Sequence, residues 1–114
     1  MIRKEELHTT DIIDVVISDA QITRLIKRSS LARRILRGLM VGDAYLSELA
    51  RRIDSDPSNC QQCINGDSIR YARGLIDYGL VFRYSDRRGA LYYGITDRGR
   101  EILKKMSEVW EQGP

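Results

Sequence analysis

Amide and hydroxyl side chains crowd a short stretch in the middle of the chain, residues 57–65, which reads PSNCQQCIN. If this stretch is a helix, Cys60, Cys63 and Ile64 share one side of it, and Ser, Asn and Gln occupy the rest. Lys and Glu usually dominate a face that is merely solvated. Asn and Gln can both donate hydrogen bonds to base edges and accept them. The pattern therefore favours recognition of nucleic-acid bases, with an ordinary solvated helix as the alternative.

Cys60 and Cys63 form a CxxC pattern within the same stretch. A structural zinc site needs four ligands, and the only other soft candidate in the chain is His8. A thioredoxin-like motif would need a strand just before it and a βαβ context, which the sequence does not predict. We expect both thiols to be buried as small hydrophobic side chains, with a redox or metal switch in this helix as the alternative.

The residue pattern gives catalysis no support. The chain has one histidine, no nucleophile and base at a recognisable spacing, and no glycine loop that would cradle a phosphate. We therefore expect a protein that is not an enzyme, with no cofactor and no metal ion.

The residues before Pro57 predict the element that orients this helix. Residues 45–53 carry apolar side chains at i, i+3, i+4 and i+7, which predicts an amphipathic helix with one face toward a core. Asp54 and Ser55 then form a turn, Asp56 is a good N-cap, and Pro57 suits the first helical position. Two helices joined by a tight polar turn predict a helix-turn-helix.

The rest of the chain supplies the supporting elements. Residues 11–28 fit a helix better than a strand, with a break near Ser18, and residues 31–41 fit a helix with Met40 among its inward side chains. Ser68 can cap a helix over 69–78 that Gly79 closes. Residues 81–84 and 91–95 predict a β-hairpin whose connection, SDRRGA, holds a glycine for a positive φ. Thr96 then caps a final amphipathic helix that ends near residue 111.

Length and charge bound the possible partners. The 114 residues suit one domain with a modest core, and a net charge of +3 permits a polyanionic partner. Residues 31–53 hold five arginines, which suit phosphate contact because the guanidinium fork matches phosphate oxygens; a solvated charged surface is the alternative. No apolar run is long enough to span a membrane, no signal peptide is evident, and two cysteines suit a reducing cytoplasm.

Three stretches together resemble the small archaeal and bacterial winged helix-turn-helix transcriptional regulators: YLSELARRI (45–53), DPSN (56–59) and IDYGLVFRYSDRRGALYYGITDRGREIL (76–103). In those regulators a helix ends in a Gly-Leu-Val step, a basic hairpin follows, and a Thr-x-x-Gly turn opens the final helix. The resemblance covers roughly residues 31–106 and is most specific over 79–99. It implies a mainly α fold with a small β-hairpin (α+β), in which a winged domain (31–111) follows an N-terminal extension (1–30).

This chain departs from the commonest family pattern in one respect. The recognition helix usually runs straight into the Gly-Leu-Val step, whereas here residues 54–66 intervene between the second helix and the helix ending at Tyr78. Either residues 57–65 are the recognition helix, or residues 68–78 are the recognition helix behind an insertion. We favour the first arrangement, because some archaeal regulators have a similar Pro-Ser-Asn start.

The resemblance also implies a set of contact residues. The helix from Pro57 would enter the major groove of DNA, and the hairpin would lie along the backbone or the minor groove. Base contacts are then assigned to Ser58, Asn59, Gln61 and Gln62, and phosphate contacts to Ser47, Arg51, Arg70, Arg73, Arg87 and Arg88. For Arg87 and Arg88, a charged hairpin that only protects an exposed strand edge is the alternative.

The expected function is sequence-specific binding of double-stranded DNA by a transcriptional regulator. A homodimer is expected from the resemblance and from Met106, Val109 and Trp110, which a small core would leave partly exposed. Two alternatives stay open: a winged-helix protein-interaction module in a transcription or RNA-processing assembly, and a non-specific chromatin-type binder. A DNA reader should present a positive face around the helix from Pro57, whereas an interaction module should present an apolar patch there.

Overall fold

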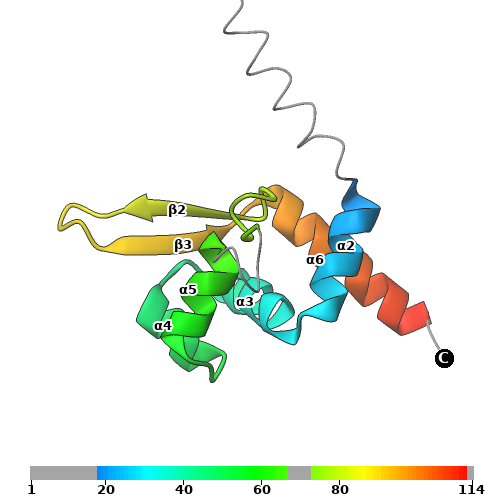
Figure 1. Cartoon of the computed structure of the whole chain (residues 1–114), viewed down its shortest axis with the longest axis horizontal. Coiled ribbons are helices and arrows are strands. Elements are labelled where there is room, and N and C mark those ends of the chain that lie inside the picture. The colour runs from blue at the N-terminus through cyan, green and yellow to red at the C-terminus, as the bar shows by residue number, and fades with distance from the viewer. Residues whose placement is uncertain (1–17, 67–72, 113–114) are drawn as a thin grey trace, which may run out of the picture.

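The protein is described by a computed structural model that covers residues 18–66 and 73–112, with side chains up to Met106. It combines helices with a small sheet, and the hairpin projects from one end of the helical body while α2 and α6 lie at the other (Figure 1). This mixture confirms the expected fold class, mainly α with a small β-hairpin. The elements are α2 (Asp19–Arg28), α3 (Ser30–Val41), β1 (Ala44–Tyr45), α4 (Leu46–Arg52), α5 (Pro57–Asn65), β2 (Val81–Ser85), β3 (Leu91–Ile95) and α6 (Asp97–Gln112).

Side-chain caps fix the starts of four helices. Asp56 accepts from the backbone N–H of Asn59 at 3.2 Å, as expected for α5. Ser18 starts α2, so the helix predicted over 11–28 is confirmed from Asp19 onward, and residues 11–17 lie outside the described part. Ser29 starts α3, and Thr96 starts α6 by accepting from the Gly99 N–H at 3.0 Å.

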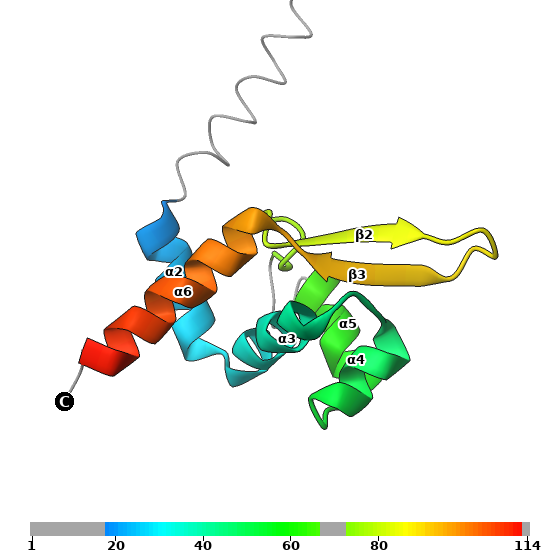
Figure 2. The ribbon, with the colours of Figure 1, turned by 180° about the vertical axis from the view of Figure 1, so that it is seen from behind.

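The sheet has three antiparallel strands in the order β1-β3-β2. The hairpin predicted over 81–84 and 91–95 is present, and its register runs from Val81 opposite Ile95 to Ser85 opposite Leu91. We call this hairpin, residues 81–95, the wing. The short strand β1 was not predicted, and it pairs Ala44 with Tyr93. From behind, α3 lies in front of α4 and α5, beneath the sheet (Figure 2).

The hydrophobic core centres on α3. Ile35 and Leu36 are fully buried and face side chains of α5, α6 and the sheet. The expectation that Met40 points inward is wrong, because its side chain is 52% exposed. Ala32, Ile35, Leu36 and Leu39 already fill the inward stripe at i, i+3, i+4 and i+7, and Met40 lies about a quarter of a turn beyond it.

The helix predicted over 69–78 is wrong for its described part, because residues 73–80 form turns, while residues 67–72 lie outside the described part. These turns cover the C-terminal end of α5 (Figure 1). Leu75 N–H donates to the Cys63 carbonyl and Ile76 N–H to the Ile64 carbonyl, both at 3.1 Å. In a continuous helix these carbonyls would accept from the residues four positions later. A later piece of chain therefore supplies the donors of the next helical turn.

Gly79 ends these turns in the left-handed backbone conformation that a closing glycine commonly adopts. Its φ is +74°, its N–H donates to the Ile76 carbonyl, and the Leu80 N–H donates to the Leu75 carbonyl. This pair of bonds is the Schellman motif, which normally ends helices. Leu80 and Leu75 are both buried, so the motif fixes the entry into the wing.

Arg98 and Lys105 of α6 tie α2 to the rest of the molecule. Both contact the Asp19 carboxylate, Arg98 at 3.1 Å and Lys105 at 3.2 Å. Arg98 also donates to the Tyr78 carbonyl at 3.2 Å, so one guanidinium links α2, α6 and the turn before the wing. No helix in the described ranges is both long and apolar enough to cross a membrane.

Candidate nucleic-acid interface

The outward face of α5 is polar along its length. Ser58 and Gln61 are exposed, Asn59, Gln62 and Asn65 are half-buried, and Cys60, Cys63 and Ile64 are buried on the opposite side. The Oε1 atom of Gln62 is buried and accepts no hydrogen bond within the described part of the chain. The structure thus brings four of the predicted base-contacting residues (Ser58, Asn59, Gln61 and Gln62) together on one short helix.

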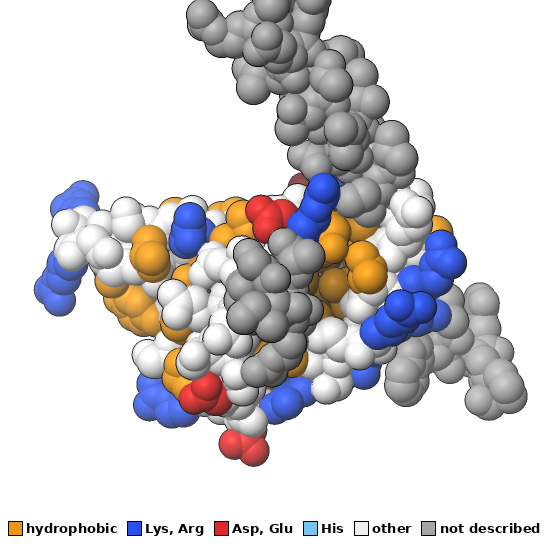
Figure 3. Space-filling model, viewed as in Figure 1, with side chains coloured by type: hydrophobic (Ala, Val, Ile, Leu, Met, Phe, Trp, Pro, Cys, Tyr) orange, Lys and Arg blue, Asp and Glu red, His pale blue; other side chains and the backbone are white. Residues whose placement is uncertain are grey.

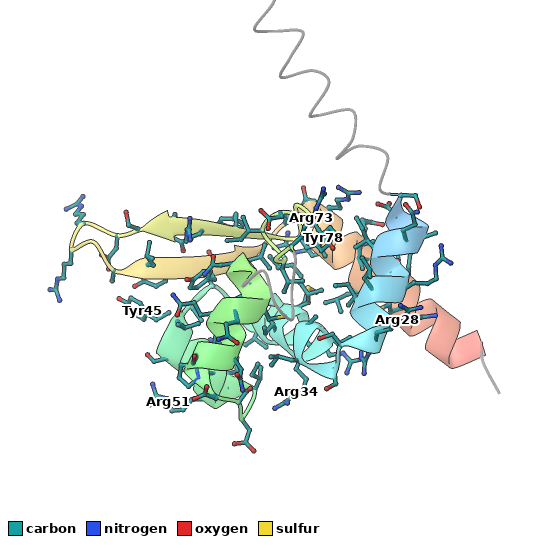
Figure 4. All side chains as sticks on the ribbon, viewed as in Figure 1. Arg28, Arg34, Tyr45, Arg51, Arg73 and Tyr78 are labelled. Atoms are coloured by element: carbon teal, nitrogen blue, oxygen red, sulfur yellow. The ribbon has the colours of Figure 1, made fainter. Side chains whose placement is uncertain are left out.

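The predicted phosphate-contacting residues divide into three groups. Ser47 and Arg51 are exposed on α4, and Arg51 lies near the turn that leads into α5 (Figure 4). Arg73 is half-buried near the base of the wing, far from Arg51 (Figure 4). Arg70 lies outside the described residues. Arg87 and Arg88 are exposed at the tip of the wing.

The tip that carries Arg87 and Arg88 has a defined geometry. The Asp86 carboxylate accepts from the backbone N–H of Arg88 at 2.8 Å and from that of Ala90 at 3.0 Å. Gly89 has a φ of +84°, as the predicted turn requires. In the view that faces α5, basic side chains stand at the free end of the wing and at the lower edge of the molecule (Figure 3). The area between them in this view holds apolar as well as uncharged polar side chains, together with the acidic side chains described below.

Three of the five arginines in residues 31–53, none of them among the assigned phosphate contacts, have structural partners. Arg33 donates to the Ile26 and Lys27 carbonyls that end α2, and Arg34 donates to the Ile53 and Asp54 carbonyls that follow α4. Arg52 donates to the Gly38 and Gly42 carbonyls at the end of α3, at 2.7 and 2.8 Å. Within the group of five, Arg37 and Arg51 are left as exposed arginines without such a role.

Two acidic residues lie beside the N-terminus of α5. Asp54 and Asp56 are both exposed, and Asp54 has a φ of +54° in the turn between α4 and α5. Acidic side chains are visible at the lower edge of the molecule in the view that faces α5 (Figure 3). A phosphate approaching this turn would meet two carboxylates close to Arg51, so the tip of the wing is the better placed of the two basic sites to receive a phosphate.

An aromatic ladder covers one face of the sheet and was not predicted. Tyr45, Tyr92, Tyr84 and Phe82 stack across the three strands, with ring centroids 4.1, 5.4 and 5.7 Å apart. Alternation along β2 places them on the opposite face from Arg83. The hairpin register, once drawn, pairs Tyr84 with Tyr92 and would have revealed this part of the ladder.

Hydrogen bonds tie the ladder to acidic residues at its edges. The Tyr84 hydroxyl donates to Asp43 at 2.8 Å, which raises the pKa of Tyr84. The hydroxyls of Tyr92 and Tyr45 lie 2.5 Å apart, and this bond, together with the nearby Asp86 carboxylate, raises the pKa of Tyr45 to about 12. Tyr84 and Tyr45 therefore stay neutral at pH 7, and the ladder stiffens the wing.

Cys60 and Cys63 behave as the hydrophobic interpretation predicts. Both are free thiols with no more than 2% of their surface exposed, and burial raises the pKa of the Cys60 thiol. Within the described ranges, no group of three or more His, Cys, Asp or Glu side chains is placed to hold a metal ion. His8 lies outside those ranges, so within the described residues the metal alternative has only the two cysteines as ligands.

The architecture is a helix-turn-helix, α4 and α5, followed by a wing. Residues 22–106 match the model of the EarA-like family, and the chain belongs to that family. It is 37% identical over 95 residues to the uncharacterized protein MJ0905 of Methanocaldococcus jannaschii, a match that covers 79% of this chain and 85% of the relative. It also resembles the crystal structure of RV1404 from Mycobacterium tuberculosis, with a TM-score of 0.52, 20% identity, and 99% of this chain and 80% of that chain covered. At that identity the likeness concerns the fold alone.

Proposed function

We propose that this protein is a transcriptional regulator that binds double-stranded DNA in a sequence-specific manner. In this proposal α5 enters the major groove, and the wing lies along the backbone or the minor groove. Ser58, Asn59, Gln61 and Gln62 contact bases, while Ser47, Arg51, Arg87 and Arg88 contact phosphates. Arg70 and Arg73, on the segment after α5, keep their phosphate assignment as part of the proposal.

One observation carries this proposal. The helix α5, with its row of amide and hydroxyl side chains, begins near Arg51 and ends against β2 of the wing, whose tip carries the exposed Arg87 and Arg88 (Figure 4). Cations near a row of uncharged amides suit DNA, because cations contact phosphates and amides can pair with base edges. Among the exposed large apolar side chains of the wing, Phe82 and Tyr84 lie on the face of the sheet opposite Arg83, and Leu91 lies on the same face as Arg83.

A homodimer in the cytoplasm, with no cofactor and no catalytic role, completes the proposal. Two copies would read two half-sites, spaced by a whole number of helical turns. Met106 is 2% exposed and belongs to the core of a single copy, so it adds no surface for dimerisation. The side chains of Val109 and Trp110, which also suggested a dimer, lie outside the described part.

Selection of bound duplexes from a random library tests the proposal. The wild-type protein should enrich one motif, with two copies of it if the dimer forms. Gln61→Ala should relax the base preference at one position while keeping affinity for mixed DNA within a few-fold. The reason is that amide contacts with bases determine sequence preference, whereas phosphate contacts supply affinity for any sequence. Gln21→Ala on α2 is the matched control and should select the wild-type motif. A wild-type pool with no enriched motif would contradict sequence-specific binding.

The second candidate is a winged-helix module that binds another protein. The aromatic ladder favours it, because Phe82, Tyr84 and Tyr45 are 37–42% exposed on one continuous face. That face is opposite Arg83, and not around α5 where the interaction module was expected to be apolar. If the library selection fails while Tyr84→Ala abolishes a specific protein contact in the cell, this second function replaces the first.

A further inference from the structure

Arg83 of β2 contacts the last residue of α5. Its Nη1 donates to Oδ1 of Asn65 at 3.1 Å. A guanidinium carries only donors, so the amide atom that faces it must be the oxygen. The orientation of the Asn65 amide is therefore fixed by chemistry, and its nitrogen with two N–H donors points away from Arg83.

The backbone beneath Asn65 is held as firmly as its side chain. The N–H groups of Leu75 and Ile76 bond to the two carbonyls before Asn65, and the Gly66 N–H bonds to the Gln62 carbonyl at 2.7 Å. A Cβ on Gly74 would lie 2.4 Å from the Asn65 carbonyl carbon, so that turn packs directly on the Asn65 peptide. Asn65 cannot reorient cheaply while these contacts stand.

Asn65 lies on the outward stripe of α5. It follows Ser58 by seven residues and Gln62 by three, so the three side chains share one helix face. Asn65 was not among the predicted contact residues. Its position in this stripe could have identified it from the sequence, whereas its contact with Arg83 could be seen only in the folded structure.

The fixed amide changes which base Asn65 can read. Asn normally pairs with adenine through two bonds, accepting from N6 and donating to N7. Here the oxygen already serves a guanidinium, and a second donor would have to approach beside that positive charge. The free N–H donors suit guanine instead, because N7 and O6 are both acceptors in the major groove.

We propose that Arg83 is a positioning residue for base recognition: it locks the Asn65 amide so that the C-terminal end of α5 reads guanine in preference to adenine. This inference rests on the proposed DNA-binding function. It makes the wing part of the specificity of the reading helix, in addition to any contact of the wing with phosphate.

The test compares base preference in four variants by competition between duplexes that differ by guanine or adenine at one position of the selected site. Wild type should prefer guanine about tenfold at the position read by Asn65. Arg83→Ala should lose or reverse that preference. Arg87→Ala, the matched control on the same hairpin, should lose a similar amount of affinity for mixed DNA and keep the preference. Asn65→Ala and the Arg83→Ala plus Asn65→Ala variant should be indistinguishable at that position.

Two results would overturn the inference. One is an Arg83→Ala protein whose guanine preference equals that of Arg87→Ala. The other is an Asn65 side-chain amide NMR signal, recorded without DNA, that is unchanged by Arg83→Ala. We expect that NMR signal to shift in Arg83→Ala and to stay in place in the control variant Arg87→Ala. If wild type binds no DNA while the signal does move, the lock stands and the proposed function has failed.

Discussion

At the scale of single residues, arginines act as bridges between helices. Arg33, Arg34 and Arg52 each donate to carbonyl groups at the C-terminal end of a helix other than their own. Carbonyls in the last turn of a helix lack the usual helical partner four residues later, and a planar guanidinium can serve two of them at once. These three side chains join consecutive helices, so their removal should cost stability more than it costs binding.

The two thiols of α5 give a residue-scale prediction. Cys60 and Cys63 are buried and burial raises the pKa of Cys60, so a disulfide-exchange reagent should react with less than a tenth of a thiol per native chain at pH 8. Two thiols should react once urea unfolds the protein. Ser58→Cys, on the exposed side of the same helix, is the control and should add one thiol that reacts at once. Rapid reaction of native wild type would contradict the buried packing.

Residue types alone could not distinguish arginines that bond to carbonyls at helix ends from arginines that are free to contact a phosphate. Arg51 and Arg52 are neighbours on α4, yet the Arg51 side chain is exposed to solvent, whereas the Arg52 side chain donates to a carbonyl in the last turn of α3. The difference depends on a carbonyl that lies fourteen residues away in sequence and comes close only after folding. The cysteines were easier to predict, because the helical stripe that they share with Ile64 is a local pattern.

At the scale of elements, α5 is a short helix completed from outside itself. A nine-residue helix has marginal stability alone, and here its final carbonyls are bonded by residues 75 and 76. The Schellman motif at Gly79 then directs the chain into β2. The helix α5 and the wing are thus joined by a rigid turn as well as by the contact between Arg83 and Asn65.

Gly74→Ala tests this joint. The added Cβ would lie 2.1 Å from the Ile64 carbonyl oxygen, and the three nearest atoms all belong to the backbone of residues 64–66, which cannot move aside as a flexible side chain could. We expect a loss of about 3 kcal/mol in the free energy of unfolding, measured by urea denaturation. Gly89→Ala is the control: its Cβ meets open space and only the positive φ is unfavourable, for about 1 kcal/mol. Equal losses in the two variants would show that the turn does not pack on α5.

Element prediction succeeded where capping residues and periodicity agreed. Asp56 and Pro57 marked the start of α5, and the glycine turn with its aromatic flanks marked the wing. The helix over 69–78 was wrong in its described part because apolar spacing at Leu75 and Ile76 has a second explanation, packing of a returning turn on another helix. The two-residue strand β1 carried no periodic signal, because two residues are too few to show one.

At the scale of the whole molecule, α2 is fastened to α6 by ion pairs between residues far apart in sequence. Lys105 and then Arg98 hold the pKa of Asp19 below its ordinary value through hydrogen bonds. A lowered pKa means that the ionised carboxylate stabilises the fold. That contribution is complete above the unfolded pKa of about 4 and is lost as the pH falls through the lower, folded value.

Asp19→Asn should reveal this contribution. At pH 7 we expect a loss of about 0.5–1 kcal/mol in the free energy of unfolding, small because the pair is 42–49% exposed and screened by solvent. At about pH 2 the variant and wild type should agree. Asp97→Asn is the matched control, since Asp97 also begins a helix but pairs with Arg100 of its own helix. A loss at pH 7 no larger than that of the control would contradict the tether.

The central claim concerns the whole molecule: the face formed by α4, α5 and the wing binds duplex DNA. The most direct test is fluorescence-anisotropy binding to a mixed-sequence duplex across a salt series. Wild type should bind with a steep salt dependence. Arg87→Ala plus Arg88→Ala should flatten the slope of log K against log salt by about two units, one for each phosphate contact.

Arg24→Ala plus Arg28→Ala removes the same charge from α2, and Arg28 lies at the end of the molecule opposite the wing (Figure 4). This control should keep the wild-type slope. Binding that flattens only in the wing variant would support the interface described here. Absence of binding at low salt, or equal slopes in all three proteins, would contradict it.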